Sequence, residues 1–139
     1  MSVGRICVRE VALADANETA MAAARRMKRA GVGTLIVLDQ VKRPIGLVTD
    51  RDLVVRVIAA GKSPKTTRVR DVMTTTLKII REDSPIEDAL GMMRGSGLRR
   101  LPVVNREGQL VGIVSLDDVL ALLAEEFALI GGVLKSQSA

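Results

Sequence analysis

The chain has 139 residues, of which 47% are hydrophobic and 27% charged, and its formal net charge is +5. This composition is typical of a globular protein that buries a core, and the length fits one compact domain or two small modules that share a core. The chain has no histidine and a single cysteine, Cys7. This excludes imidazole bases, Ser/His/Asp and Cys/His catalytic groups, His-ligated zinc and an internal disulfide.

The positive charge is concentrated in the first half of the chain. Residues 1–69 hold 13 Lys and Arg against 6 Asp and Glu, a net charge of +7, whereas residues 70–139 hold 8 against 10, a net charge of −2. Such a basic surface attracts phosphates or acidic partners, but solvated helix arginines explain the same charge. The lone cysteine predicts a cytoplasmic protein, and no apolar run reaches the roughly 20 residues that span a membrane.

A shift of 66 positions aligns residues 11–60 with residues 77–126 without a gap, so the chain is an internal duplication. In the first copy, hydrophobic spacing predicts a helix from near Asn17 to Gly31. Strands are predicted over Thr34–Leu38 and Ile45–Val48, and a second helix is predicted to end near Ala60.

The second copy repeats this order after a linker. Its first helix is predicted to begin at Asp83-Ser84-Pro85, with Pro85 in the first helical position, and to end at Gly97. Strands follow over Leu101–Val104 and Leu110–Val114, and a last helix is predicted to run to about Ile130. We therefore predict repeats at residues 1–62 and 69–131, a linker at 63–68 and a C-terminal tail at 132–139.

A unit of about sixty residues with two or three short strands can hardly bury its own sheet. The two copies are therefore expected to pack on one another. The predicted product is an α+β module with approximate two-fold symmetry, in which the strand-to-helix junctions of both copies face one cleft.

These junctions are the most constrained part of the duplication. GLVTDRDL, Gly46 to Leu53, returns as GIVSLDDV, Gly112 to Val119. Thr49-x-x-Asp52 and Ser115-x-x-Asp118 fit a capping box at a helix start. Glycine inside a strand indicates that something approaches the backbone closely, and a ligand is one candidate. Helix amides, a hydroxyl and a carboxylate together suit the phosphate and ribose of a nucleotide.

The duplicated junction resembles that of a CBS (cystathionine β-synthase) domain pair. RRLPVV from Arg99 to Val104 and VRDVMT from Val69 to Thr74 add to this resemblance. The resemblance implies βαββα repeats with two clefts that bind AMP, ADP, ATP or S-adenosylmethionine. It also implies disc-shaped homodimers that have a regulatory function and no catalytic activity, and that require no further cofactor or metal.

The resemblance assigns roles to individual residues. Asp52 and Asp118 would hold ribose hydroxyls, while Thr49 and Ser115 would line the phosphate end of each cleft. Each cleft would also borrow from the other repeat, so that Asp52 would meet Arg99, Arg100 and the segment of Thr74, Thr75, Thr76 and Leu77. Arg51 would be a further phosphate contact. Pro102 completes the expected ligand-binding set.

The two clefts are expected to be unequal. Gly33 and Thr34 stand in the first repeat where the second has Arg99 and Arg100, and Asp117 stands where the first has Arg51. We therefore predict that the Asp52 cleft binds a phosphorylated adenosine. The Asp118 cleft is predicted to bind weakly, to prefer a less charged ligand or to stay empty. Surface salt bridging is the alternative explanation for the arginine pair.

Two other classes of function compete with nucleotide sensing. A weak nucleic-acid-binding protein would use the basic first half, but aromatic stacking platforms are missing because Phe127 is the only aromatic residue. A ligand-free dimerisation module is the second alternative. The last helix carries apolar residues along one side, and Phe127 and Ile130 are predicted to contact a second subunit. The regulated partner protein is not identified by the sequence.

Overall fold

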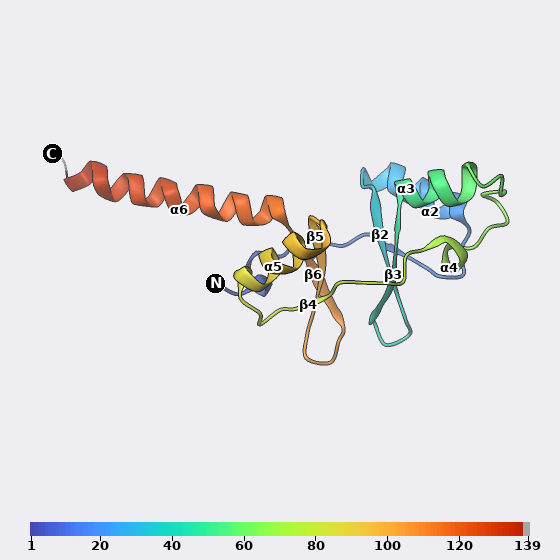
Figure 1. The fold of residues 1–139 in the computed structure, drawn as a ribbon, viewed down its shortest axis with the longest axis horizontal. Coiled ribbons are helices and arrows are strands. Elements are labelled where there is room, and N and C mark those ends of the chain that lie inside the picture. The colour runs from blue at the N-terminus through green and yellow to red at the C-terminus, as the bar shows by residue number, and fades with distance from the viewer. Residues whose placement is uncertain (138–139) are drawn as a thin grey trace.

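The computed structural model describes residues 1–137 and contains two similar halves, each built on a three-stranded sheet (Figure 1). In each sheet the middle strand pairs in parallel with the short first strand and antiparallel with the third strand. The α+β class is therefore confirmed. The first sheet contains β1 (Leu13–Ala14), β2 (Thr34–Leu38) and β3 (Pro44–Thr49), and the second contains β4 (Ile80–Arg81), β5 (Arg100–Val104) and β6 (Leu110–Ser115).

Helices flank both sheets. The Thr19 hydroxyl caps the first long helix by accepting the Ala22 N–H at 3.2 Å, and Gly31 ends this helix in the left-handed region, with φ of 65°. Gly97 ends the equivalent helix in the same way, with φ of 70°. The helices are α1 (Val3–Ile6), α2 (Ala20–Ala30), α3 (Asp50–Leu53) with the π-helical turn η1 (Val54–Ile58), α4 (Val69–Val72), α5 (Ile86–Ser96) and α6 (Leu116–Gln137).

Three predicted helix ends differ from the structure. Helix α2 begins at Ala20, because Thr19 rather than Asn17 supplies the cap. Pro85 occupies the cap position of α5 instead of the first helical position, and no side chain caps this helix. Helix α6 continues beyond Ile130 to Gln137, through two glycines that weaken a helix but do not force it to end.

The two halves exchange their leading segments. Val3, in α1, is fully buried in the core of the second half, and its N–H donates to the Ser84 carbonyl at 2.8 Å. Val69 and Val72, in α4, are buried in the core of the first half. Each half therefore contains the segment that precedes the other repeat in the sequence.

The sheets also bury residues on the side away from these cores. Leu35 and Val37 belong to the first core, and Ile36 between them points to the opposite face but is also fully buried. The hairpin loops of the two halves are joined as well, since the Leu110 N–H donates to the Lys42 carbonyl at 2.9 Å. The expected packing of one repeat on the other is therefore found.

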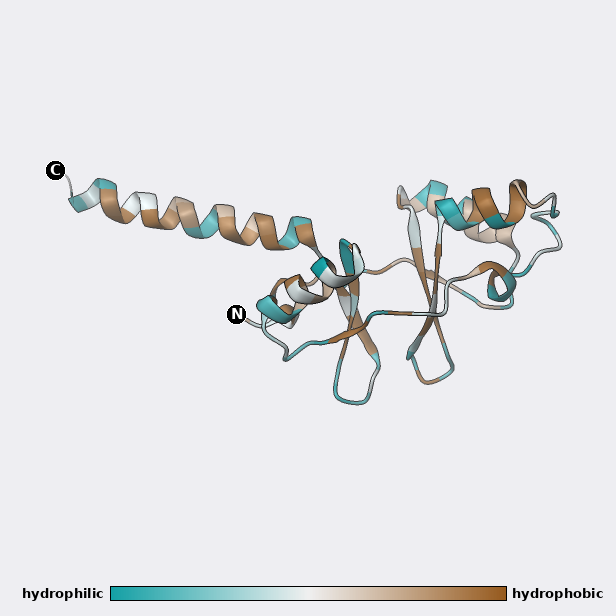
Figure 2. Cartoon of the chain, in the orientation of Figure 1, coloured by the Kyte–Doolittle hydropathy of each residue, from teal (hydrophilic) through white to brown (hydrophobic). Residues whose placement is uncertain are grey.

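Helix α6 projects away from the rest of the protein (Figure 1). Its residue Val119 is buried, but the hydrophobic residues further along the helix are exposed, including Phe127 at 70% and Ile130 at 54%. Figure 2 shows brown, hydrophobic segments along the length of this helix. Within residues 1–137, no helix is both long and apolar enough to cross a membrane.

Candidate functional site

Both repeated junctions form reciprocal capping boxes. The Thr49 N–H donates to Asp52 Oδ2 and the Asp52 N–H donates to Thr49 Oγ1, both at 3.0 Å. Ser115 and Asp118 make the same pair of hydrogen bonds at 2.8 and 3.1 Å. The capping interpretation of these motifs is therefore confirmed. It also fixes the orientation of each carboxylate, because one oxygen is held by the backbone.

The protein itself explains the two strand glycines. A Cβ atom at Gly112 would lie 2.6 Å from the Val8 carbonyl oxygen, and one at Gly46 would lie 2.6 Å from Met73 Sδ. The close approach at each glycine is thus made by the segment that crosses from the other repeat. A ligand, which was one candidate for this close approach, is therefore not needed to explain the two glycines. Burial at the same crossing raises the pKa of the Cys7 thiol.

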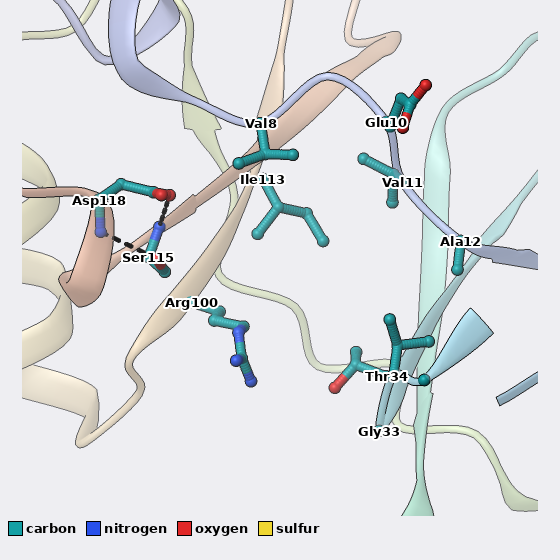
Figure 3. A pocket seen from close by; sticks show the side chains of 12 residues that line it. Val8, Glu10, Val11, Ala12, Gly33, Thr34, Arg100, Ile113, Ser115 and Asp118 are labelled. Carbon is teal, nitrogen blue, oxygen red and sulfur yellow. Dashed lines mark hydrogen bonds between the residues drawn. The ribbon is translucent and has the colours of Figure 1, made fainter. Parts of the chain in front are cut away.

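A cavity of about 350 Å³ lies between the two halves beside Ser115 and Asp118 (Figure 3). This volume is at the lower end of the roughly 300–1,000 Å³ that is typical of small-molecule sites. Three separate parts of the chain line the cavity. They are the crossing segment with Val8, Glu10, Val11 and Ala12, the turn with Gly31, Val32, Gly33 and Thr34, and the second repeat with Arg100, Ile113, Ser115 and Asp118.

The strand ladder places Arg100 in this cavity. Arg100 begins β5 and pairs directly with Ser115 at the end of β6, so its side chain is beside the junction of its own repeat. We had expected Arg100 in the cleft of Asp52. Thr34 reaches the same cavity from the first repeat, as the sequence predicted for the residue that replaces Arg100 there.

The cavity combines opposite charges. Arg100 contributes a guanidinium, and Glu10 and Asp118 contribute carboxylates. Asp118 uses Oδ2 in the capping box, and within residues 1–137 no hydrogen bond or ion pair reaches its Oδ1. Val8, Val11 and Ile113 supply aliphatic surface. The cavity can therefore accept hydroxyl donors at Asp118, an anion at Arg100 and an apolar group between them.

Arg99 does not reach the cavity beside Asp118. Its Nη2 lies 3.5 Å from Asp117 Oδ1, and both side chains are about 70% exposed. This contact is the surface salt bridge that we considered as the alternative explanation for Arg99. Arg51 is also exposed, and its backbone N–H donates to the Asp50 carboxylate.

The segment that follows α4, residues 73–77, lies beside the Asp52 junction and is the second crossing segment, equivalent to the one with Val8. Thr74 and Leu47 exchange two backbone hydrogen bonds of 2.7 and 2.9 Å, which hold this segment against β3. Thr75 and Thr76 are exposed beyond this bridge, whereas Leu77 is half-buried. The 66-residue shift maps Thr74, Thr76 and Leu77 onto Val8, Glu10 and Val11, the residues that line the Asp118 cavity.

Pro102, in β5, shortens the pairing of β5 with β4. In the first sheet, the Ile36 N–H donates to the Ala12 carbonyl at 3.0 Å. Pro102 stands at the equivalent position of β5 and has no N–H to donate. Strand β4 accordingly starts at Ile80, while β1 already includes the equivalent of residue 79. Pro102 itself is buried.

Comparison with known proteins identifies the duplicated unit. Residues 3–59 and residues 69–125 each match the CBS domain profile. The chain belongs to the CBS domain family. The resemblance deduced from the repeated junction is thus confirmed, and proteins that contain a pair of CBS domains are regulatory modules.

Relatives of this CBS pair include archaeal and bacterial proteins. An uncharacterized protein of Methanopyrus kandleri is 37% identical over 120 residues, which is 86% of this chain but only 61% of that protein. Hypoxic response protein 1 of Mycobacterium tuberculosis is 33% identical over 125 residues, 90% of this chain and 82% of the relative.

Solved structures share the fold. A crystal structure of Hypoxic Response Protein I with two coordinated zinc ions has a TM-score of 0.78 at 29% identity, and covers 87% of this chain and 98% of its own. A CBS domain pair in complex with 5′-methylthioadenosine and S-adenosylmethionine has a TM-score of 0.77 at 23% identity. The match covers 91% of this chain and 98% of that chain. Among residues 1–137 of our protein, no three His, Cys, Asp or Glu side chains cluster to form a metal site.

Sequence reasoning missed part of the cavity of this CBS pair. Val8, Glu10 and Val11 were not predicted. The 66-residue shift makes them equivalent to Thr74, Thr76 and Leu77, which the sequence analysis did predict. Applying the duplication to the segment before residue 11 would have found them. Arg56, which contacts Asp52, was also missed, although its spacing of four residues from Asp52 in a predicted helix is a local signal that could have found it.

Proposed function

We propose that this CBS pair is a regulatory module that binds an adenosine compound in the cavity beside Asp118 and transmits its ligand state to a partner protein. The observation that carries the proposal is the Asp118 carboxylate. The capping box holds one of its oxygens, and the other has no partner within residues 1–137. A carboxylate fixed in this way can accept hydrogen bonds from ribose hydroxyls.

Neighbouring groups supply the other contacts that such a ligand needs. Arg100 offers a forked, charge-assisted contact to a phosphate or carboxylate. Ser115 and the start of α6 lie at the positive end of a 22-residue helix, which favours an anion. Val8, Val11 and Ile113 would enclose the adenine ring by apolar contact.

The charges of the cavity restrict the choice of ligand. Two carboxylates, of Glu10 and Asp118, stand against one guanidinium, of Arg100. Several phosphates would meet repulsion from the carboxylates, whereas one phosphate or a zwitterionic side chain is matched by opposite charges. AMP and S-adenosylmethionine are therefore favoured over ADP and ATP at this cavity. This agrees with the less charged ligand predicted for the Asp118 side.

We also propose that the module works as a cytoplasmic homodimer. The apolar side of α6 supports this assembly, since an exposed row of large hydrophobic residues is costly in water. The lack of aromatic platforms argues against the nucleic-acid alternative. The regulated protein would distinguish the liganded from the free state of the pair.

Calorimetric titration tests the proposed function. The purified protein is titrated with AMP, ADP, ATP, S-adenosylmethionine and GTP. The AMP titration is then repeated with the Asp118→Ala variant. We expect saturable binding of AMP or S-adenosylmethionine, and the substitution should remove the tighter of the binding events, because the ribose acceptor beside α6 is lost. Absence of binding by every adenine compound would contradict the proposal and favour the ligand-free dimerisation module.

A further inference from the structure

The side chain of Arg56 forms an ion pair with the Asp52 carboxylate. Arg56 Nε lies 3.6 Å from Asp52 Oδ1, while Oδ2 of the same carboxylate accepts the Thr49 N–H at 3.0 Å. The Asp52 side chain is only 12% exposed, so little of it is left to solvent. Both oxygens of Asp52 therefore already have partners inside the protein.

Arg56 also connects this carboxylate to the end of α4. Its Nη1 donates to the carbonyls of Val72 and Met73, at 3.3 and 3.4 Å. These two residues lead directly into Thr74, where the second crossing segment meets β3. Arg56 thus links the Asp52 carboxylate to the entry of this segment.

The second repeat lacks this arrangement. The 66-residue shift maps Asp52 onto Asp118 and Arg56 onto Leu122, whose aliphatic side chain forms no ion pair. As a result Asp118 Oδ1 has no partner within residues 1–137, although the capping box around it matches that of Asp52. The two repeated carboxylates differ in this one contact.

We propose that Arg56 makes the two clefts unequal by competing with the ligand for Asp52. A ribose bound there must replace a charged partner, whereas a ribose at Asp118 meets a free oxygen. The Asp118 cleft is then the tighter site, which reverses the order that we predicted from the sequence. This inference rests on the proposed function, and it adds a specificity-determining residue that lies outside the repeated motif.

The test isolates the Asp52 cleft. Asp118→Asn removes the carboxylate at the other cleft, while the Asn carbonyl oxygen still accepts the capping N–H of Ser115. In this background, AMP and S-adenosylmethionine are titrated with and without Arg56→Leu, the residue that the second repeat has at this place. We expect Arg56→Leu to tighten binding about fivefold, the factor associated with loss of a partly exposed ion pair.

A reciprocal variant and a charge control complete the design. Leu122→Arg, made in the Asp52→Asn background, places a cation beside Asp118 and is expected to weaken binding there about fivefold. Arg29→Leu removes the same charge from α2, at a residue that belongs neither to the lining of the Asp118 cavity nor to a capping box, and is expected to leave affinity unchanged. It shows whether any effect of Arg56→Leu arises from net charge alone.

The outcomes separate the inference from the proposed function. If the wild-type protein binds AMP but Arg56→Leu leaves the affinity of the Asp52 cleft unchanged or weakens it, the inference is overturned and the proposed function stands. An equal gain from Arg29→Leu also overturns it. If neither probe binds to the wild type or to any variant, the proposed function fails, and the inference fails with it.

Discussion

Val8 and Ile113 exchange two backbone hydrogen bonds, with N to O distances of 2.8 and 2.9 Å, although they are far apart in the sequence. This bridge runs over Gly112 and fastens the N-terminal segment to the second sheet. Thr74 and Leu47 make the equivalent bridge over Gly46 in the other half. Each crossing segment is therefore held by a strand that belongs to the other copy of the duplication.

Gly112→Ala is expected to destabilise the protein more than Gly46→Ala. The new Cβ at residue 112 would lie 2.6 Å from the Val8 carbonyl oxygen, which is backbone held by the bridge. At residue 46 it would meet the sulfur of Met73, a flexible side chain that can turn away. Denaturant unfolding should show a loss of about 2 kcal/mol for Gly112→Ala and under 1 kcal/mol for Gly46→Ala. Equal losses would contradict this explanation.

The fold could be predicted because its signals are local and occur twice. The strand runs are apolar and β-branched, and Gly31 and Gly97 mark the same helix end in both copies. The length of α6 was not predicted, because Gly131 and Gly132 resemble a helix end by propensity alone.

The candidate site was predicted less completely, because it depends on long-range pairing. The motif identified Ser115 and Asp118, whose contacts are local. The sequence did not predict that Arg100 lines the Asp118 cavity, since this position depends on its pairing with Ser115 across β5 and β6. That pairing includes a register shift between Val103 and Val104, for which the sequence carries no clear signal.

Arg100→Ala should separate phosphate recognition from nucleoside recognition. The Arg100 side chain lines the Asp118 cavity and is the cation available there to a phosphate. AMP should bind about tenfold more weakly to the variant, while adenosine, which lacks the phosphate, should bind with unchanged affinity.

Arg99→Ala is the matched control for this experiment. Arg99 precedes Arg100, but its guanidinium pairs with the exposed Asp117. Its loss should leave the affinity for AMP within about twofold of the wild type. A larger effect of Arg99→Ala than of Arg100→Ala would restore the arrangement predicted from the sequence, with Arg99 in a nucleotide cleft.

Glu10→Gln should broaden the ligand range of the cavity. Glu10 places a carboxylate on the crossing segment that lines it, so a triphosphate meets a like charge there. Removing this charge should strengthen the binding of ATP about fivefold and change the binding of AMP less. Calorimetric titration of both nucleotides gives the two ratios. An equal change for both would show that Glu10 does not select against phosphates.

Glu18→Gln should reduce the acid sensitivity of the fold. Hydrogen bonding to Arg26 lowers the pKa of the Glu18 carboxyl, and Arg26 Nη2 lies 2.6 Å from Glu18 Oε2. A lowered folded-state pKa stabilises the protein above the unfolded-state pKa, and this contribution is lost as the pH falls through the folded value.

The measurement is urea unfolding at several pH values. At pH 7 the variant should be less stable than the wild type by about 1 kcal/mol. This difference should shrink as the pH is lowered below the ordinary range of a Glu carboxyl, because Glu18 then becomes protonated in the wild type. A difference that is independent of pH would indicate a packing effect instead of the ion pair.

Phe127→Glu should disrupt the proposed homodimer. Leu120, Leu123, Phe127, Ile130 and Leu134 follow one another at alternating spacings of three and four residues, the pattern of a helix-packing seam. All five are between 46% and 70% exposed on the isolated helix. A buried carboxylate in the middle of this seam would carry a high desolvation cost.

Light scattering after size exclusion gives the mass of each variant. The wild type should have twice the chain mass of 14.9 kDa, and Phe127→Glu should have the mass of one chain. Glu125→Gln provides the control, since it lies about 200° around the helix from Phe127 and should leave the mass unchanged. A wild type that is monomeric at high concentration would exclude the homodimer. The exposed side of α6 would then be left for a different protein partner, which fits a module that reports its ligand state to another chain.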